Sequence, residues 1–231
     1  MKLIMRKMLN VYLNWKKSQN IKFLSLLEFN PNAKVIDLGC GDGEFTLRIK
    51  SKIGASEVYG VDIYEPSIEK ARMKGIKVIK HDLNEFPYPF DDNTFDVVVS
   101  NQVIEHLIYP VRFLREVYRI LKPKGYVVIS TENLASWDNI LALVLGYTPF
   151  SMEFDNGLWK IGNPLSPHNR EIIDLNIPPH VRIFSFKGLV ELMEFIGFKI
   201  EKIVGSGHIL GKIGEILDKR HCRFITIKAR K

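Results

Sequence analysis

Three glycines at alternate positions follow a short apolar run, and they constrain the fold more than any other feature of this chain. Residues 35–43 read Val-Ile-Asp-Leu-Gly-Cys-Gly-Asp-Gly, and a helix-compatible segment, 44–52, follows directly. A strand, a tight loop and a helix N-terminus in this order allow a small ligand to approach backbone N–H groups closely. The pattern predicts a ligand site at the carboxyl end of a parallel sheet.

An acidic residue closes the next apolar run of the chain. Asp62 lies nineteen residues after Gly43 and directly follows the run 58–61. A carboxylate at the tip of the second strand of such a sheet is where a ribose diol is bound. The glycine loop and Asp62 together predict a cofactor that contains a nucleoside. A strand-end cap is the alternative role for Asp62.

The charges around the loop distinguish between classes of nucleoside cofactor. A dinucleotide-binding loop has glycine at its sixth position, but the sixth position counted from Gly39 is Glu44. Asp37 and Asp42 add two more carboxylates, and carboxylates near a helix N-terminus repel a pyrophosphate. They suit a ligand with an ammonium and a sulfonium, which describes S-adenosylmethionine. A plain tight turn is the alternative interpretation of the glycines.

Five segments of the chain resemble the class I S-adenosylmethionine-dependent methyltransferases. They follow the order of the family's motifs and are residues 37–43, 61–63, 81–83, 95–107 and 121–125. The resemblance extends over 33–131 and 186–230. It is strongest to small-molecule, glycan and lipid methyltransferases related to quinone-biosynthesis enzymes. The chain departs from the pattern at Lys124, where many members have a second glycine.

The resemblance implies an α/β fold with a doubly wound, mostly parallel sheet of seven strands. The implied strand order is 3-2-1-4-5-7-6, with the last strand antiparallel and an insert after the fifth strand. Apolar patterns place the strands at 34–38, 57–62, 76–80, 95–100, 125–131, 198–204 and 224–229, and helices at 44–53, 65–74, 110–121 and about 189–196. We expect one methyltransferase domain over 1–231, with an N-terminal helical segment, 1–30, and a substrate-site insert or lid, 133–185.

Positions that match the family's motifs are the expected cofactor contacts. By resemblance, Asp37 holds the methionine amino group, directly or through water, and Asp62 accepts hydrogen bonds from both ribose hydroxyls. The other implied contacts are Ile63, Asp82 and Leu83 at the adenine, Asn101 and Gln102 at the methyl group and methionine chain, and the loop residues Gly39, Cys40, Gly41 and Gly43. A turn aspartate is the alternative for Asp82, and capping of the next short helix is the alternative for the two amides.

Methyl transfer from a sulfonium depends on positioning more than on chemical activation. Orientation alone supplies roughly 7–11 kcal/mol of such a barrier, so no strong catalytic constellation is needed, and the sequence shows none. An oxygen nucleophile near neutral pH still needs a general base. We expect His106 in this role, with His180 as a second candidate. A histidine that fills a loop–helix joint is the alternative for His106.

The insert is the expected substrate site. By resemblance to glycan and lipid enzymes, two Pro-His segments of the insert lie near the acceptor, and their arginines suit an acidic one. The expected substrate contacts are Trp137, His168, Arg170 and Arg182. Pairing with a surface acid is the alternative for Arg182. The apolar residues of the insert predict a lid over an apolar acceptor, a membrane-facing patch, or a lid with a small core of its own.

The net charge of +7 is concentrated at the two ends of the chain. Residues 1–22 hold six Lys or Arg and no acid, and residues 212–231 hold seven with two acids. Basic ends can bind nucleic acid or an anionic membrane, although solvated lysines are the interpretation we favour. Two cysteines indicate no disulfide framework and favour a cytoplasmic location. The histidines lack zinc-site spacing, so no metal is predicted.

The sequence therefore predicts an S-adenosylmethionine-dependent methyltransferase that acts on a small molecule, a glycan or a lipid precursor. Oxygen is the expected methylated atom. An RNA methyltransferase, similar to enzymes that modify tRNA, is the first alternative. A non-catalytic subunit that binds the cofactor for a partner is the alternative of another class. No transmembrane segment is expected, and peripheral membrane contact is compatible with the apolar insert.

Overall fold

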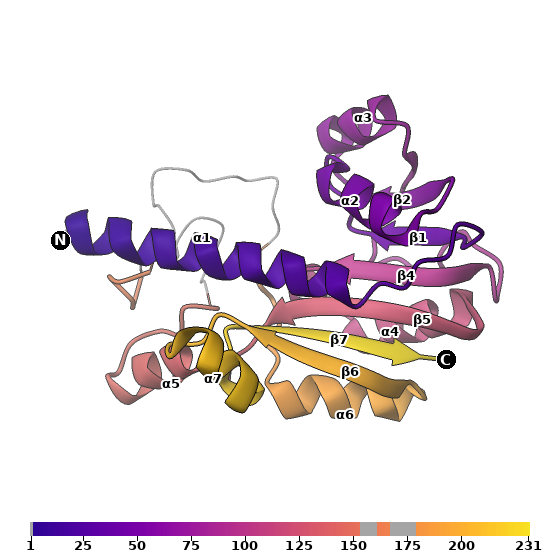
Figure 1. The fold of residues 1–231 in the computed structure, drawn as a ribbon. Coiled ribbons are helices and arrows are strands. Elements are labelled where there is room, and N and C mark those ends of the chain that lie inside the picture. Colours follow the sequence, from indigo (N-terminus) through magenta and orange to yellow (C-terminus); the bar gives the residue numbers. More distant parts are fainter. Residues whose placement is uncertain (1, 153–160, 167–178) are drawn as a thin grey trace.

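The computed structural model describes residues 2–152, 161–166 and 179–231, and it contains a seven-stranded sheet (Figure 1). The strands are β1 (Val35–Leu38), β2 (Val58–Asp62), β3 (Lys77–Lys80), β4 (Phe95–Asn101), β5 (Leu121–Glu132), β6 (Lys199–Ser206) and β7 (Phe224–Arg230). Their spatial order is β3-β2-β1-β4-β5-β7-β6. β7 is antiparallel to β5 and β6, and the other neighbouring pairs are parallel. The predicted strand order and α/β fold class are confirmed.

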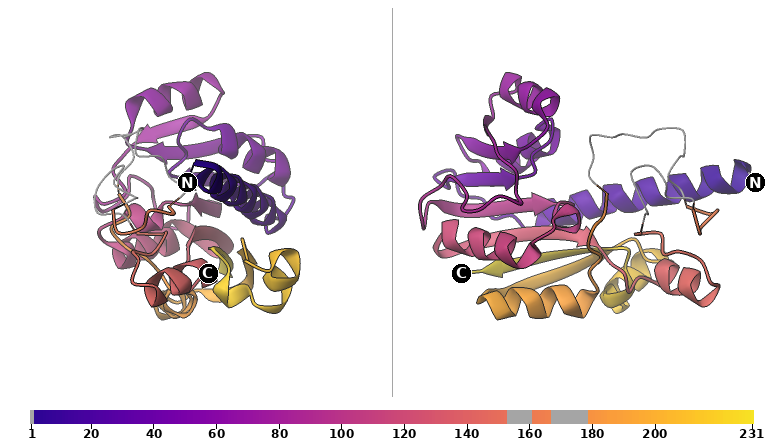
Figure 2. Two further views of the ribbon diagram at one scale, coloured as in Figure 1. Left: turned by 90° about the vertical axis from the view of Figure 1, so that its left-hand side faces the viewer. Right: turned by 180° about the vertical axis from the view of Figure 1, so that it is seen from behind.

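Helices cover both faces of this sheet (Figure 2). In the described part of the chain they are α1 (Lys2–Ser25), α2 (Glu44–Ile53), α3 (Glu65–Met73), α4 (Pro110–Ile120), α5 (Trp137–Val144), α6 (Phe186–Ile196) and α7 (Gly211–Leu217). Two short 3-10 helices, η1 (Ile104–His106) and η2 (Lys219–His221), follow β4 and α7. α2, α3 and α4 begin where the apolar and proline patterns predict them.

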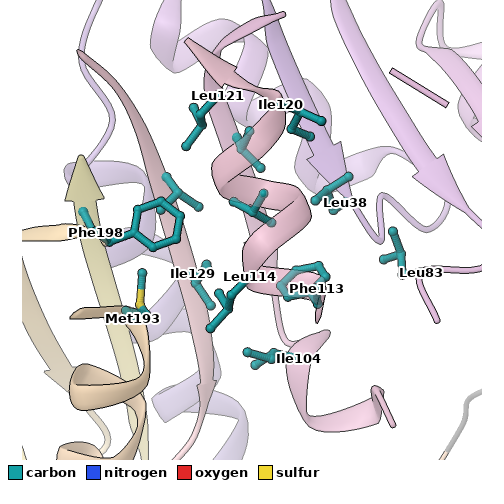
Figure 3. Packing of buried hydrophobic residues seen from close by; sticks show 14 of the residues in the cluster. Leu38, Leu83, Ile104, Phe113, Leu114, Ile120, Leu121, Ile129, Met193 and Phe198 are labelled. Carbon is teal, nitrogen blue, oxygen red and sulfur yellow. The ribbon is translucent and has the colours of Figure 1, made fainter. Parts of the chain in front are cut away.

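Successive residues of the central strands enter two separate cores. Val97 and Val99 of β4 pack in one core with α1, α2 and α3, whereas Val98 packs in the other core with α4 and α6. In the second core, Leu114 of α4 and Met193 of α6 point toward the sheet (Figure 3). Because both faces are covered, the strands are apolar along their length, as parallel sheets require.

The predicted N-terminal helical segment contains a single helix, α1. The side-chain amide of Gln19 donates hydrogen bonds to Asn101 Oδ1 at 2.8 Å and to Ser130 Oγ at 2.7 Å. The Lys22 ammonium donates to the Gly205 carbonyl. These contacts fix α1 to β4, β5 and β6, and the N-terminal half of α1 extends past the carboxyl ends of the parallel strands (Figure 1).

The insert leaves and rejoins the sheet at one place. β5 ends at Glu132, and the next residue, Asn133, forms an isolated parallel bridge with Phe184. The two ends of the insert therefore lie side by side. The predicted substrate contacts His168 and Arg170 lie outside the described residues. Within the described ranges, each helix is too short or too polar to cross a bilayer.

Candidate active site

A cavity of about 630 Å³ opens at the carboxyl ends of β1, β2 and β4. This volume lies within the usual range for small-molecule sites. The predicted site residues that line it are Gly39, Gly41, Asp62, Ile63, Asp82, Leu83, Gln102 and His106. The returning end of the insert closes one side through Pro179 and Val181. The fold thus brings together residues from four loops that are distant in the sequence.

The glycine loop is held against the end of β2 by backbone hydrogen bonds. The N–H groups of Gly39 and Cys40 donate to the Val61 carbonyl at 2.8 and 3.0 Å. Gly41 has a φ of +52°, and a Cβ built there would meet nothing within 4 Å. Because Gly41 lines the cavity, a side chain at this position would occupy space that a ligand could fill.

Three backbone N–H groups orient the Asp62 carboxylate. Oδ2 accepts from Gly41 at 2.8 Å, and Oδ1 accepts from Ile63 at 2.9 Å and from Tyr64 at 3.0 Å. A carboxylate has about four acceptor sites in total, so the two oxygens retain capacity for further donors. The half-buried side chain faces the cavity with a fixed direction, which suits a pair of ribose hydroxyls.

Asp37 lies beneath the cavity wall rather than in it. Its side chain is buried, and the Thr46 hydroxyl donates to Oδ2 at 2.6 Å. Burial raises the pKa of Asp37 to about 7, against the lowering effect of the Thr46 hydrogen bond. Asp37 is absent from the lining of the cavity. Of the two predicted modes for the methionine amino group, this position favours contact through water.

Three other predicted cofactor contacts lie behind the cavity wall. Gly43 has a φ of +80°, and a Cβ there would lie 2.3 Å from Ile76 Cδ1, so this glycine serves helix packing. Cys40 is buried in the core beneath β2. Asn101 accepts its hydrogen bond from Gln19 of α1 instead of facing the cavity. Their roles at the cofactor stay predictions, and the described side-chain contacts of Cys40 and Asn101 are with protein.

The expected adenine side of the cavity combines apolar and polar groups. Ile63 is half exposed and Leu83 is buried, and both line the cavity. Asp82 Oδ1 accepts from the backbone N–H of Asn84 at 2.8 Å, which makes it a turn aspartate. Asn84 in turn accepts from the Ile108 N–H at 2.8 Å. Asp82 is therefore a turn aspartate that also lines the cavity, and its contact with the adenine stays a prediction.

Gln102 holds a left-handed backbone at the end of β4. Its φ is +59°, which is uncommon for a residue other than glycine and is often found at functional sites. The side-chain amide donates to Ser130 Oγ at 2.8 Å, and the backbone N–H donates to the Ser130 carbonyl at 2.9 Å. Ser130 thereby links β5 to the cavity, and no local pattern in the sequence indicates this role.

The two predicted catalytic histidines lie together beside the cavity. His106 lies at the end of η1, and His180 comes from the returning end of the insert. Their ring centroids are 4.8 Å apart in an edge-to-face arrangement. His106 Nδ1 lies 3.2 Å from the Pro179 carbonyl, and His180 Nδ1 lies 2.9 Å from the Ser151 carbonyl. Since a carbonyl only accepts, both Nδ1 atoms must donate.

A buried acid that the sequence did not single out supports the histidine pair. Glu105 is 2% exposed, and the Thr131 hydroxyl donates to its Oε2 at 2.9 Å. Burial raises the pKa of Glu105 to about 7. Its backbone carbonyl accepts from the N–H groups of Val181 and Arg182, which fastens the insert to η1. The sequence does contain a sign of this buried acid, because Glu105 is the one acidic residue in the mostly apolar segment 103–107.

Glu105, His106 and His180 also form the type of group that could hold a metal ion. One potential ligand atom from each residue lies within 4.8 Å of the others. Carboxylate and imidazole groups bind several divalent metals. The expectation of no metal rested on spacing along the chain, which cannot detect ligands from two distant segments. That expectation stays a prediction.

The two predicted substrate contacts of the insert that lie within the described residues have different positions. The Trp137 indole N–H donates to Asp218 Oδ2 at 2.9 Å, and its ring lies 4.7 Å from that of His221. Trp137 therefore lines a separate hollow beside α7 and not the cavity. Arg182 is exposed, and its Nη2 donates to the Ile108 carbonyl at 3.5 Å. This contact places Arg182 near the mouth of the cavity.

Comparison with known proteins identifies the family. Residues 36–129 match a family described as a methyltransferase domain. A probable S-adenosylmethionine-dependent methyltransferase of Mycolicibacterium smegmatis is 31% identical over 209 residues, which are 90% of this chain and 67% of that protein. This chain belongs to the class I S-adenosylmethionine-dependent methyltransferases. A crystal structure of such a methyltransferase from Mesorhizobium loti shares the fold, with a TM-score of 0.63, 20% identity and coverage of 91% of this chain and 96% of that chain.

A more specialised methyltransferase is similar over a shorter region. The mitochondrial ubiquinone biosynthesis O-methyltransferase of Dictyostelium discoideum is 33% identical over 150 residues. The match covers 59% of this chain and 45% of that protein. This methyltransferase chain thus spans about two thirds of the Mycolicibacterium relative and less than half of the Dictyostelium one.

The cavity of this methyltransferase fits the cofactor of its family, S-adenosylmethionine. Backbone N–H groups orient the Asp62 carboxylate at the cavity in a way compatible with a ribose, and Gly41 leaves open space beside it. Among the described residues, the cavity lining includes no lysine or arginine. The cations that usually bind a pyrophosphate are thus missing from the described wall, while the acidic groups suit a positively charged ligand.

Proposed function

We propose that this methyltransferase transfers the methyl group of S-adenosylmethionine to an oxygen of a small-molecule, glycan or lipid-precursor acceptor. The proposal rests on His106, which lies at the end of η1 and lines the cofactor cavity. A hydroxyl acceptor must lose its proton near neutral pH, and histidine is suited to accept it. Similarity to an O-methyltransferase of ubiquinone biosynthesis supports the same acceptor atom.

The protein contributes mainly position and exclusion of water. The bound cofactor supplies a methyl group that its sulfonium charge activates. Asp62 holds the ribose end, and Leu83 packs at the adenine end. Pro179 and Val181 from the insert cover the cavity and reduce access of water. Fixing the reacting groups in line accounts for much of the barrier reduction in this type of reaction.

His106 is the proposed general base. Donation of Nδ1–H to the Pro179 carbonyl fixes the tautomer in which Nε2 accepts the acceptor's proton. A potential ligand atom of Glu105 lies within 4.8 Å of one of His106, and Glu105 stabilises a protonated imidazole there only in its ionised form, since opposite charges at short range attract. His106 therefore holds the proton after methyl transfer, and Glu105 acts as the residue that stabilises and positions it.

Replacing the base separates chemistry from cofactor binding. We expect His106→Asn to lower turnover by about 10²–10⁴-fold, the usual contribution of general acid–base catalysis. Affinity for S-adenosylhomocysteine, measured by calorimetry, should stay within about twofold because Asp62 and the glycine loop are untouched. His180→Asn is the matched control and should reduce turnover less. Unchanged turnover in His106→Asn would show that the base lies elsewhere.

The acceptor class is tested with a radiolabelled methyl donor. The protein is incubated with labelled cofactor and with separated lipid, glycan, small-molecule and RNA fractions of a cell extract. Label that enters a lipid, glycan or small-molecule fraction and resides in a methyl ether or ester supports the proposal. Label in the RNA fraction would replace it with the RNA alternative. Tight binding of adenosylhomocysteine without labelling of any fraction would favour a non-catalytic subunit.

A further inference from the structure

A group of aliphatic side chains is exposed on two helices outside the active site. On α5 and the residue after it, Val144 and Leu145 are 76% and 67% exposed. On α7 and the residue before it, the exposed side chains are Leu210, Ile213, Ile216 and Leu217, from 69% to 81% exposed. Exposed groups of large apolar side chains often mark a surface with a binding role. We call these six residues the α5–α7 patch.

The two helices of the patch are fastened to each other and to the protein. Trp137 at the start of α5 donates its indole N–H to Asp218 at the end of α7. A hollow of about 390 Å³ lies between them, lined by Trp137, Leu210, Ile213 and Leu217. The inner face of α7 packs tightly, because a Cβ at Gly214 would lie 1.9 Å from the His208 ring. The aliphatic side chains therefore lie on a fixed outer face.

Within the described chain, the exposed charges on and beside α7 are of one sign. The acids of both helices bind basic groups or polar groups of the protein: Asp138 pairs with Arg223 at 2.8 Å, Glu215 with Lys22 at 2.6 Å, and Asp218 contacts His221 at 2.8 Å. The exposed charged side chains of 209–220 are Lys212, Lys219 and Arg220. An apolar face flanked by cations is complementary to an anionic lipid surface.

The patch lies at the same edge of the sheet as the cofactor cavity. α5 follows the carboxyl end of β5, and α7 lies between the end of β6 and the start of the antiparallel β7. The end of β5, the end of β6 and the start of β7 all lie at the edge of the sheet where β1, β2 and β4 end and the cavity opens. The N-terminal half of α1, which includes the exposed Arg6 and Lys7, also extends from this edge (Figure 1).

We propose that the α5–α7 patch docks this protein on the surface of an anionic lipid bilayer, with the aliphatic side chains inserted among the lipids and the basic residues at the headgroups. The docking does not depend on the proposed reaction. Only one consequence rests on the proposed reaction: a docked protein could take a lipid-soluble acceptor from the bilayer into the cavity at the same edge. The protein binds the membrane peripherally, because the patch consists of two short helices and not a spanning one.

Two other occupants fit the patch less well. A second copy that docked through this face would bring Lys212, Lys219 and Arg220 of both copies together, and like charges at an interface oppose association. An RNA would meet the cations but would leave the six aliphatic side chains in contact with phosphate or water. An anionic bilayer satisfies both the apolar face and the basic rim.

Vesicle flotation tests the proposal with the full chain. The protein is mixed with vesicles of phosphatidylcholine alone, or of phosphatidylcholine and phosphatidylglycerol in equal parts. We expect binding to the anionic vesicles. Ile213→Ser with Leu217→Ser should reduce the partition coefficient by at least about tenfold, because burial of two aliphatic side chains is lost. Met73→Ser with Phe195→Ser is the matched control, since both side chains are equally exposed on α3 and α6, and it should bind as the unaltered protein does.

The charge contribution is tested separately. Lys212→Gln with Arg220→Gln should weaken binding to the anionic vesicles and should make the remaining binding less sensitive to salt. Binding of adenosylhomocysteine serves as the folding check for every variant, so a misfolded variant is recognised. Absence of flotation with anionic vesicles, or an equal loss in the Met73–Phe195 control, would overturn the proposal. A dimer in solution that Ile213→Ser with Leu217→Ser disrupts would assign the patch to a second copy.

Discussion

Burial determines how the acidic residues of this site behave. Asp37 and Glu105 are enclosed by protein, and burial raises the pKa of each to about 7. Asp62 lies at the cavity surface, where three backbone N–H groups orient its carboxylate. The three acids lie in β1, at the end of β2 and in η1, and of the three only Asp62 lines the cavity. The acids differ because Asp37 and Glu105 lie below the protein surface whereas Asp62 lies at the cavity surface, and this depth cannot be read from their positions in the sequence motifs.

The raised pKa of Asp37 predicts that cofactor affinity depends on pH. In the free protein, Asp37 is largely protonated below about pH 7. An ammonium group bound nearby favours the carboxylate, so binding releases a proton below this pH. We expect the affinity for adenosylhomocysteine to fall by up to about tenfold for each pH unit below 7 and to level off above it. Calorimetry across this range measures the effect.

The matched variant for this prediction is Asp37→Asn. It keeps the shape of the side chain and can still accept the hydrogen bond from Thr46, but it does not titrate. We expect weaker binding with little dependence on pH over the same range. A variant that retained the full pH dependence would show that a different group titrates.

Element boundaries could be predicted closely where the pattern is local. The strands and helices from β1 to α4 match the predicted ranges to within one residue at each end. Apolar runs mark the strands, and prolines mark the starts of two helices. β5 begins at Leu121 and not at residue 125, since Leu121 already pairs with Phe95 of β4. The segment Lys122–Gly125 has the residues of a turn, so the sequence predicted a strand only after it. Pairing of Phe95 with Leu121 extends β5 to the residue before this segment.

The junction between α2 and α3 gives a prediction at the scale of elements. Gly43→Ala combines a positive φ with a Cβ that would lie 2.3 Å from Ile76 Cδ1 and 3.2 Å from the Cα of Ala71. We expect the free energy of unfolding to fall by about 3 kcal/mol, from strain and overpacking together. Urea denaturation followed by tryptophan fluorescence measures this change.

Gly75→Ala separates strain from packing. Gly75 has a φ of +79°, nearly that of Gly43, but a Cβ there would meet nothing within 4 Å. We expect a loss of only about 1–2 kcal/mol, the cost of a left-handed alanine. Equal losses in the two variants would mean that the close contact with Ile76 contributes nothing.

A buried ion-pair network connects distant parts of the molecule. Arg223, the residue before β7, is 1% exposed and pairs with Glu132 of β5 at 2.9 Å and with Asp138 of α5 at 2.8 Å. Glu132 is buried as well, so its charge depends on this arginine. The network fixes the insert to the sheet at the edge where the cavity opens.

Removing the arginine tests how much the whole molecule depends on this network. We expect Arg223→Met to lower the free energy of unfolding by about 3–5 kcal/mol, because Glu132 stays buried but loses the cation that compensates its charge. Adding Glu132→Gln should recover part of the loss, since the buried charge is removed. Urea denaturation of both variants measures the difference. A loss below about 1 kcal/mol for Arg223→Met would contradict the prediction.

The sequence by itself determined the glycine loop, the acid that follows the second strand, and the approximate bounds of the elements from β1 to α4, because apolar runs, glycine spacing and an acid after a strand are local patterns. The sheet order and the cofactor family followed from the resemblance of these motifs to a methyltransferase family. Only the tertiary structure decided that Asn101 bonds to α1, that Trp137 faces α7, and that Glu105 joins His106 and His180. Each of these outcomes depends on contacts between segments far apart in the chain, and no local pattern encodes such distances.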